Sequence, residues 1–351
     1  MSLALVSAAE VAAGRDAHDT VIDARSPAEY AEDHLPGAEN WPVLDDEQRR
    51  IVGTLFKQVS PLQARKVGGA MVARNIASHL ERWVADKPRE WRPLVYCWRG
   101  GQRSGTLAWF LGQVGFRTAQ LQGGYKGFRA IVRRDLQTWP QRFDFRVLCG
   151  RTGSGKTRLL QALTEAGAQT LDLEALAGHR GSVLGGWPGR PQPSQKRFDT
   201  CVWQALASFD PARPVYVEGE SRKIGLLRVP EALILQLREH GRCIRVELDE
   251  PARLRLLLQE YGHFADDVDG FNRMLEGLTE LRGRETVQGW QAQARAGQWP
   301  QVFAELMQRH YDPLYERSLR SGYRHMDQAL RLQLPDAEPA TLRAAVAGLP
   351  V

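Results

Sequence analysis

The stretch Gly150–Thr157, which reads GRTGSGKT, constrains the fold of this 351-residue chain more than any other feature. It fits G-x-x-x-x-G-K-[S/T] in full, with a strand-like run (145–149) before it and helical apolar spacing (158–166) after it. Its glycines let backbone N–H groups approach phosphate oxygens, Lys156 adds a positive charge, and Thr157 can ligate Mg²⁺. The predicted diphosphate-binding residues are Gly150, Arg151, Thr152, Gly153, Ser154, Gly155, Lys156 and Thr157.

The second half of the chain has an α/β pattern around this loop. Strand-like runs near 145–149, 169–173, 214–218 and 242–248 each lead into a helical stretch, and the last hundred residues are mainly helical. Glu218 ends the third of these runs and is a candidate acidic metal partner. We therefore predict a P-loop NTPase-like α/β domain with a helical C-terminal part.

The loop predicts binding of a diphosphate or a triphosphate and leaves the rest of the ligand open. Polar segments elsewhere in this half carry cations that could contact such a ligand. As a group they suggest a polyanion pocket formed by Arg180, Lys196, Arg222 and Lys223.

The first half has its own α/β pattern with a predicted parallel sheet. Strand-like runs at 20–23 and 93–96 are followed by a helix from about Ser104 to Val114, and a long, mostly helical insertion rich in Arg and Lys covers about 45–90. The segment 133–144 contains Pro140 and loses apolar periodicity. We place the domain boundary there, which gives domains 1–138 and 139–351.

A cysteine loop is the candidate site of the first half. Residues 96–104 read YCWRGGQRS, so Cys97 follows a strand-like run and precedes a helix. The predicted anion-binding residues of this loop are Arg99, Gly100, Gly101 and Arg103. Their positive field should stabilise the thiolate, so we predict that Cys97 is a reactive nucleophile.

The other three cysteines, Cys149, Cys201 and Cys243, lie in strand-like or helical runs, and we predict buried, unreactive thiols. No C-x-x-C or paired Cys/His spacing predicts a zinc site. A cysteine followed six residues later by arginine also occurs in phosphatases, which is the main alternative for the first half.

The first half resembles the rhodanese family. The matching motifs are VIDARSPAEY at 21–30, HLPGA at 34–38, Cys97 with Arg103, and LQGGY at 121–125. The D-x-R and H-x-P-G-A elements favour this family over phosphatases. The resemblance implies a rhodanese-like parallel-sheet domain whose loop cysteine carries sulfur or selenium as a persulfide or perselenide.

Composition narrows the possible partners. Apolar residues make up 43% of the chain and charged residues 25%, and no apolar run approaches the ~20 residues of a membrane-spanning helix. With no basic start typical of a secretory signal, we expect a soluble, cytoplasmic protein without membrane contact. The net charge of +6 suits a polyanionic partner, and a mixed aromatic and basic set could contact RNA: Trp83, Lys87, Arg89, Trp91 and Arg92.

A rhodanese-like domain followed by a P-loop domain resembles the tRNA 2-selenouridine synthase family over nearly the whole chain. Further matching stretches are GHRGS at 178–182, PSQK at 193–196 and EGESRKIG at 218–225. The resemblance implies a transferase that modifies the wobble uridine of tRNA. In that family 2-thiouridine is S-geranylated from geranyl diphosphate, and selenium from selenophosphate then replaces the geranylthio group.

The resemblance implies no tightly bound organic cofactor, and Mg²⁺ is a possible ion at the P-loop. Two alternatives remain at this point. One is a P-loop kinase or GTPase carrying a regulatory rhodanese domain, and the other is an enzyme that only transfers sulfur.

Overall fold

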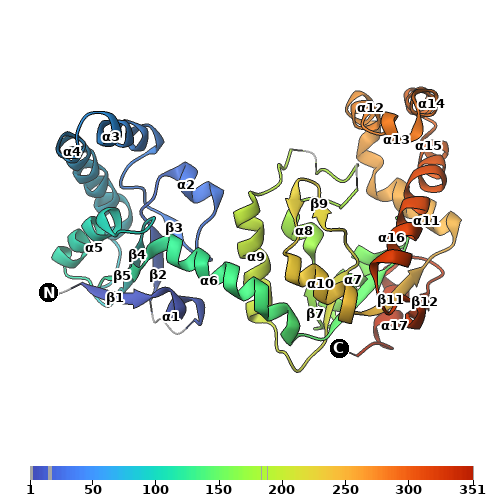
Figure 1. The fold of residues 1–351 in the computed structure, drawn as a ribbon, viewed down its shortest axis with the longest axis horizontal. Helices are drawn as coiled ribbons and strands as arrows, with labels where there is room; N and C mark the ends of the chain where they lie inside the picture. The colour runs from blue at the N-terminus through green and yellow to red at the C-terminus, as the bar shows by residue number, and fades with distance from the viewer. Residues whose placement is uncertain (1–2, 15–17, 183, 188, 351) are drawn as a thin grey trace. The chain divides into compact units, whose positions relative to one another are not determined.

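The computed structural model describes residues 3–14, 18–182, 184–187 and 189–350 (Figure 1). The chain forms two compact units, which are described separately. Unit 1 comprises residues 1–135 together with 194–200, and unit 2 comprises 136–193 together with 201–351. The first unit thus includes a short segment that lies about sixty residues beyond the boundary expected from the sequence.

Unit 1 is built on a five-stranded parallel sheet in the order β1-β5-β4-β2-β3. Its strands are β1 (Ala4–Ser7), β2 (Thr20–Asp23), β3 (Glu39–Asn40), β4 (Pro93–Tyr96) and β5 (Ala119–Gln122). Strand β4, which is fully buried, lies in the middle of the sheet, as expected for an apolar run in a parallel sheet covered on both faces. The predicted strands 20–23 and 93–96 are confirmed.

The helices of unit 1 include the predicted insertion. They are α1 (Ala8–Ala12), α2 (Pro27–Glu32), α3 (Asp46–Gln58), α4 (Pro61–His79), the π-helical turn η1 (Leu80–Val84), α5 (Gln102–Val114) and α6 (Gly124–Thr138). Helix α3 begins with a capping box in which Asp45 and Gln48 satisfy each other's backbone N–H groups. Helix α4 approaches α3 closely because Gly68 has no side chain, and a Cβ there would lie 3.1 Å from Val52.

One residue of the predicted RNA-binding set is part of the core of unit 1. Trp91 is buried with Ile22, Val95 and Leu107, and its indole N–H donates to the Thr20 hydroxyl at 3.0 Å. Its ring is therefore unavailable to RNA, although Trp83 of the same set is exposed.

Unit 2 contains a second five-stranded parallel sheet, in the order β12-β11-β6-β8-β7. Its strands are β6 (Phe145–Cys149), β7 (Gln169–Leu171), β8 (Val215–Glu218), β11 (Arg242–Glu247) and β12 (Leu330–Gln333), and a hairpin pairs β9 (Lys223–Ile224) with β10 (Leu227–Arg228). All four predicted strands are confirmed, and β12 joins the sheet edge from the region expected to be helical.

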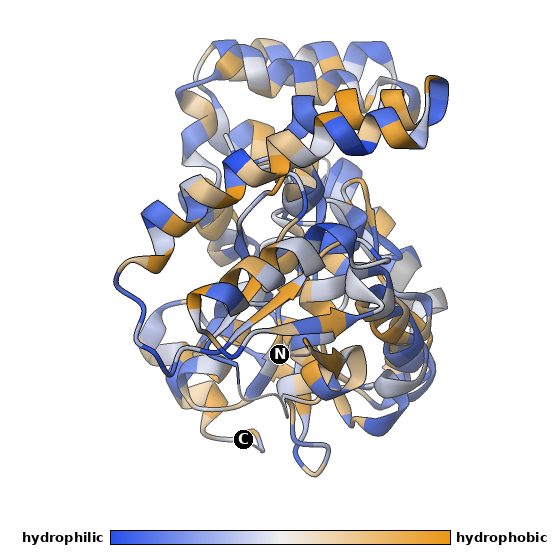
Figure 2. Ribbon diagram, turned by 90° about the vertical axis from the view of Figure 1, so that its left-hand side faces the viewer, coloured by the Kyte–Doolittle hydropathy of each residue, from blue (hydrophilic) through white to orange (hydrophobic). Residues whose placement is uncertain are grey.

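The helices of unit 2 confirm the predicted helical C-terminal part. They are η2 (Trp139–Arg142), α7 (Lys156–Glu165), α8 (Leu173–Ala177), α9 (Gln195–Ser208, which belongs to unit 1 up to Thr200), α10 (Glu231–His240), α11 (Glu250–Glu260), η3 (Gly262–Ala265), α12 (Val268–Glu276), α13 (Thr279–Arg282), α14 (Arg284–Arg295), α15 (Trp299–Leu306), η4 (Met307–Tyr311), α16 (Asp312–Gly322), η5 (Met326–Gln328) and α17 (Pro339–Val346). Figure 2 shows hydrophilic and hydrophobic residues alternating along the helices, the pattern of helices that cover a core with one face.

The chain passes from unit 1 to unit 2 between Asp135 and Leu136, inside the segment 133–144. The backbone of this segment is largely helical, because α6 runs to Thr138 and continues into the 3₁₀ turn η2. Pro140 lies in the first turn of η2, where its missing N–H costs no hydrogen bond. Cys149 and Cys243 are buried as predicted, but Cys201 is only half-buried. Among the described residues, no helix combines the length and apolarity needed to span a membrane.

Candidate functional site

Cys97 lies at the carboxyl end of β4, the middle strand of unit 1. Its side chain is 4% exposed, and its Sγ accepts a hydrogen bond from the Ser104 hydroxyl at 3.2 Å. Gln120 of β5 in turn positions Ser104, because its amide donates to Ser104 Oγ at 2.8 Å and to the Gly101 carbonyl at 2.9 Å. The sulfur therefore has a defined position at the start of the loop.

The backbone of the Cys97 loop is fixed by the start of α6. The carbonyls of Cys97 and Trp98 accept hydrogen bonds from the N–H groups of Tyr125 and Lys126 at 2.8 and 2.9 Å. This close approach requires Gly124, which has φ of +55°, and a Cβ there would lie 2.4 Å from the Cys97 carbonyl oxygen. The final motif of the rhodanese resemblance thus supports the cysteine loop.

The two predicted loop cations differ in their surroundings. Arg103 forms an ion pair with Glu29 of α2, at 2.5 and 3.1 Å, while Arg99 and Gly100 are exposed. Burial alone would raise the pKa of the Glu29 carboxyl, but the hydrogen bond and charge of Arg103 bring that pKa below its usual value. The charge of Arg103 is therefore already paired within the protein.

A buried polar network lies behind the cysteine loop. Arg25 and Asp23 form an ion pair at 2.6 Å, and the Arg25 guanidinium lies 4.0 Å from the centre of the Tyr125 ring. The Tyr125 hydroxyl donates to Asp33 at 2.9 Å, as does the hydroxyl of Thr200 from the returning segment 194–200. The D-x-R motif of the resemblance thus holds the aromatic residue beneath the loop.

The predicted phosphate loop connects β6 to α7 in unit 2. Gly153 and Gly155 have φ of +75° and +83°, a backbone conformation that favours glycine. A Cβ on Gly150 would lie 2.3 Å from Ser154 Oγ and 2.5 Å from the Val246 carbonyl. The three glycines of the motif are therefore each required by the local backbone.

Lys156 is the first residue of α7, and its ammonium reaches back across the loop. Its Nζ donates to the Gly150 carbonyl at 2.7 Å and lies 5.4 Å from the centre of the Tyr315 ring. The Tyr315 hydroxyl accepts the Gly150 N–H. Positive charge and a helix N-terminus thus meet at this loop, an arrangement that binds phosphate groups.

Residues far away in sequence hold the loop in place. Arg253 of α11 is 2% exposed and donates to the Thr152 carbonyl at 2.9 and 3.1 Å. Its guanidinium also pairs with Asp312 at 2.6 Å. Arg151, predicted to bind diphosphate, pairs with Glu316 and lies 3.7 Å from Asp312. No local sequence pattern pointed to Arg253 or Asp312 as part of this site.

Three carboxylates meet beside the phosphate loop. Glu218 at the end of β8, Glu220 just beyond it and Glu174 of α8 each place an oxygen within 4.8 Å of the other two. Glu218 is buried, and its Oε1 has no hydrogen-bond partner. Glu174 follows β7 and Glu218 ends β8, and these two strands are neighbours in the sheet. The carboxyl ends of neighbouring parallel strands lie close together, so the strand order would have indicated that the two carboxylates meet.

The electrostatics of this cluster favour a cation. Burial raises the pKa of Glu218 to about 8 and that of Glu220 to about 6, with Lys156 opposing both shifts. Burial and repulsion from its two neighbours raise the pKa of Glu174 to about 10. Oxygen ligands that repel one another suit a hard divalent cation such as Mg²⁺. The Thr157 hydroxyl, hydrogen-bonded to Glu218, completes a donor set that fits this ion.

A cavity of about 640 Å³ opens over these groups. Its polar part is lined by Lys156, Thr157, Arg180 and the three carboxylates. Its aromatic and apolar surface is supplied by Leu257, Tyr261, Tyr311, Leu314 and Tyr315. The cavity can thus accept a ligand with one anionic end and one apolar part.

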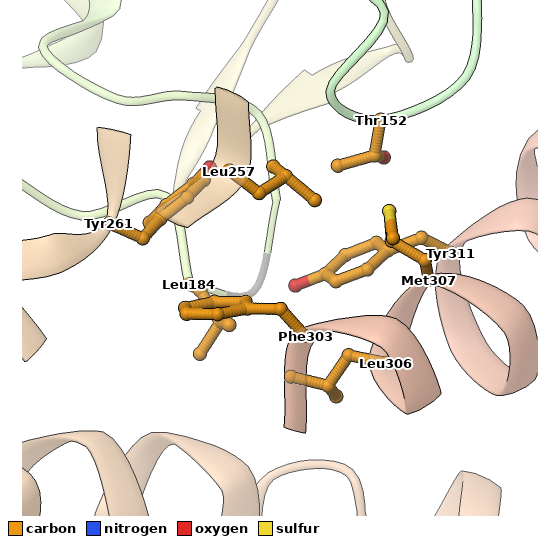
Figure 3. A pocket seen from close by; sticks show the side chains of 8 residues that line it. All are labelled: Thr152, Leu184, Leu257, Tyr261, Phe303, Leu306, Met307 and Tyr311. Carbon is orange, nitrogen blue, oxygen red and sulfur yellow. The ribbon is translucent and has the colours of Figure 1, made fainter. Parts of the chain in front are cut away.

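A smaller apolar pocket adjoins the cavity and shares Thr152, Leu257, Tyr261 and Tyr311 with it. Figure 3 shows the Tyr311 ring pointing into this pocket, with Phe303, Leu306 and Met307 around it. These side chains come from α15 and η4, in the helical C-terminal part.

The predicted polyanion group is not one cluster. Arg180 lines the cavity, where its guanidinium lies 4.9 Å from the centre of the Tyr261 ring. Lys196 belongs to unit 1 and pairs with Glu32 at 2.7 Å. Arg222 and Lys223 are exposed after Glu220 and are not among the residues that line the cavity.

Two family models match the chain. A rhodanese-like domain matches residues 7–131, and the AAA domain of tRNA 2-selenouridine synthase matches residues 143–283. The two matches cover the cysteine loop and the phosphate loop, respectively.

Individual relatives of this chain carry the name of the same family. A tRNA 2-selenouridine synthase of Alcanivorax borkumensis is 31% identical over 85% of this chain and 89% of the relative. One of Nitrosomonas europaea is 36% identical over 67% of this chain, and the matched segment spans 61% of that relative. A solved structure, a rhodanese-related protein from Thermoplasma volcanium, matches 36% of this chain and 92% of its own, with 20% identity and a TM-score of 0.24.

Proposed function

This chain belongs to the tRNA 2-selenouridine synthase family, and we propose that it converts 2-thiouridine at the wobble position of tRNA into 2-selenouridine. The observation that carries this proposal is the presence, in one chain, of a positioned cysteine at a rhodanese-type loop and a phosphate loop whose cavity has apolar and aromatic lining residues. The names of the relatives support this reading rather than the kinase or GTPase alternative.

The first step of the proposed reaction is geranyl transfer in unit 2. The sulfur of 2-thiouridine attacks C1 of geranyl diphosphate, an S–C bond forms, the C–O bond breaks, and diphosphate leaves while the base loses its N3 proton. Lys156 and the N-terminus of α7 stabilise the negative charge that develops on the diphosphate. The cavity of about 640 Å³ has apolar and aromatic lining residues, among them Leu257, Tyr261 and Leu314, which suit the geranyl chain.

A divalent cation has a place in this proposal. Thr157, Glu174, Glu218 and Glu220 would hold Mg²⁺, which when bound neutralises part of the diphosphate charge. The protein itself supplies the orientation: Arg253 fixes the Thr152 carbonyl, and the glycines fix the loop N–H groups.

The second step is replacement of the geranylthio group at C2 of the base by selenium from selenophosphate. Selenium has the same oxidation state in selenophosphate and in 2-selenouridine, so this substitution needs no oxidant. The Cys97 thiolate adds to C2 and the C–S bond to the geranylthio group breaks, so geranylthiol leaves with a proton and the base is bound to Cys97. The selenium of selenophosphate then attacks C2, the bond to Cys97 breaks and the thiolate is restored, and water hydrolyses the P–Se bond to release phosphate. The loop holds the sulfur and the backbone of Cys97 in place for both displacements.

Mass spectrometry of nucleosides tests the proposal. Purified protein is incubated with 2-thiouridine-containing tRNA, geranyl diphosphate and Mg²⁺, with or without selenophosphate. We expect S-geranyl-2-thiouridine without selenophosphate and 2-selenouridine with it. Absence of both products, together with hydrolysis of ATP or GTP by the protein, would instead support the nucleotide-dependent alternative.

A further inference from the structure

An exposed indole stands next to the reactive cysteine. Trp98 follows Cys97 directly in the loop and is 41% exposed, whereas Cys97 itself is 4% exposed. Arg99, the next residue, is exposed as well. The loop thus presents an aromatic ring and a cation beside a thiol that is itself almost covered.

The indole ring of Trp98 packs against a buried tyrosine ring. Its ring centre lies 5.5 Å from that of Tyr125, with an angle of 35° between the planes. Tyr125 is buried and fixed by its hydrogen bond to Asp33 and by the guanidinium of Arg25 over its ring. The Trp98 carbonyl is bound by the Lys126 N–H at 2.9 Å. Both the backbone and the ring of Trp98 are therefore positioned before any substrate arrives.

Other exposed tryptophans of unit 1 are not part of the Cys97 loop. Trp83 and Trp109 are exposed by 53% and 56%, but they belong to η1 and α5, although Trp83 also stacks on the buried Trp41. An exposed aromatic ring is ordinary on a protein surface. Trp98 packs at a tilt against a buried tyrosine and directly follows the nucleophile, so its ring is placed to contact the substrate that reacts at Cys97.

We propose that Trp98 is the stacking platform for the pyrimidine ring of the tRNA nucleotide that reacts at Cys97. This inference rests on the proposed function, in which C2 of that ring must come to the thiol. Proteins read bases in RNA loops by stacking them on aromatic side chains, and such contacts suit a base turned out of its own stack. Arg99 lies beside the platform, where it can contact a flanking phosphate.

Kinetics with a matched control test the role of the indole. The substrate is an anticodon stem-loop that already carries S-geranyl-2-thiouridine, supplied with selenophosphate. We expect Trp98→Ala to lower kcat/KM by about tenfold or more, mainly through KM, because stacking contributes about 1–3 kcal/mol per base. Trp98→Phe should stay within about threefold of the parent, and Trp109→Ala within about twofold.

A binding measurement separates this inference from the proposed reaction. The parent protein of this measurement, called the host, is the Cys97→Ser variant, which binds the stem-loop without turnover. Binding is detected by tryptophan fluorescence and by competition. The stem-loop should quench indole emission, and adding Trp98→Ala should remove that change and weaken binding by about tenfold. Removing the wobble base from the stem-loop should weaken binding to the host but not to the Trp98→Ala variant.

The outcomes are distinguishable. If no selenation or geranylation occurs with any variant but the fluorescence and base-removal results hold, the stacking platform stands and the proposed reaction fails. If Trp98→Ala folds, binds the stem-loop and reacts as the parent does, the platform assignment is overturned. Equal base-removal effects in host and variant would overturn it as well.

Discussion

The cysteine loop of unit 1 and the phosphate loop of unit 2 are built on the same backbone plan. Each follows the middle strand of a five-stranded parallel sheet, β4 in one case and β6 in the other. Each ends at a glycine in the left-handed region that caps the next helix, Gly101 with φ of 79° and Gly155 with φ of 83°. Both loops therefore direct backbone N–H groups and a helix N-terminus toward one point.

Their side chains give the two loops different chemistry. At Cys97 the nearby Arg103 is paired with Glu29, and a single sulfur is held by Ser104. In the phosphate loop Lys156 faces a cavity of about 640 Å³ that is lined by both carboxylates and aromatic rings. The first arrangement suits one soft atom, and the second suits a large anion with an apolar part. The comparison shows that a shared turn geometry leaves the choice of ligand to the surrounding residues.

The largest expected effect comes from removing the lysine of one loop. Lys156→Ala should lower geranyl transfer at least about 100-fold, because the developing diphosphate charge loses its nearest cation. Selenation of tRNA that already carries S-geranyl-2-thiouridine should persist. Product formation is followed by nucleoside mass spectrometry, with the exposed Lys57→Ala as control. Loss of both activities at unchanged tRNA affinity would contradict the assignment of the two steps to separate loops.

Removing the nucleophile of the other loop should give the converse result. Cys97→Ser should abolish selenation and allow geranylated tRNA to accumulate, since a serine hydroxyl is a poor soft nucleophile at neutral pH. Cys201→Ser, at a half-buried thiol on α9, serves as the control and should retain both steps. Selenouridine formed at the parental rate by Cys97→Ser would exclude Cys97 as the nucleophile.

The shared glycine caps allow a direct comparison of the two turns. Gly101→Ala and Gly155→Ala should each destabilise their unit by about 1–2 kcal/mol, because an alanine Cβ is strained in the left-handed region. Gly101→Ala should also impair selenation, since the new Cβ would lie 2.5 Å from the Gln120 amide that holds Ser104.

Urea unfolding measures both effects, with Gly112→Ala as control. Gly112 lies inside α5 with nothing within 4 Å of a Cβ, so alanine there should leave stability equal or raise it by up to about 1 kcal/mol. Equal stability of Gly101→Ala and Gly112→Ala would show that the left-handed cap does not matter.

The last expected effect is a pH dependence of stability confined to unit 2. Burial and the charge of Arg282 lower the pKa of His310 to about 4. The folded state keeps this ring neutral while the unfolded state protonates below about 6.5, so the stability present above pH 6.5 is lost as the pH falls toward 4. This group alone should contribute roughly 2–3 kcal/mol to the loss. His310→Gln should flatten the difference in unfolding free energy between pH 7 and pH 4.5, and an unchanged slope would refute this.

Much of the framework of both loops was accessible from the sequence. Short apolar runs such as Pro93–Tyr96 and Val215–Glu218 predict buried parallel strands, and both are confirmed. The glycine pattern of the phosphate loop predicted the strand, turn and helix that the structure contains. These signals are local, since each depends on residues within one turn or one strand.

The unpredicted features depend on contacts distant in sequence. Strand β12 is short and lies at the sheet edge, and it forms only because Leu330–Gln333 pairs with β11. The partner of Arg103 lies 74 residues earlier, at Glu29. Arg253 reaches Thr152 across 101 residues. No local pattern encodes such pairs, so the sequence predicted the charges but not which of them are neutralised.

Unit 1 takes in residues 194–200, and this has a consequence for how the chain emerges during synthesis. The carboxylate of Asp33 depends on Thr200 for one of its donors, and Arg129 depends on Asp199 at 2.9 Å. A nascent chain that ends at residue 138 has all five strands of this unit but neither partner. The polar network that supports the cysteine loop is therefore completed only after the ribosome has translated the phosphate loop and some forty residues beyond it. A fragment that ends at residue 138, the boundary expected from the sequence, is for this reason a poor substitute for the intact protein.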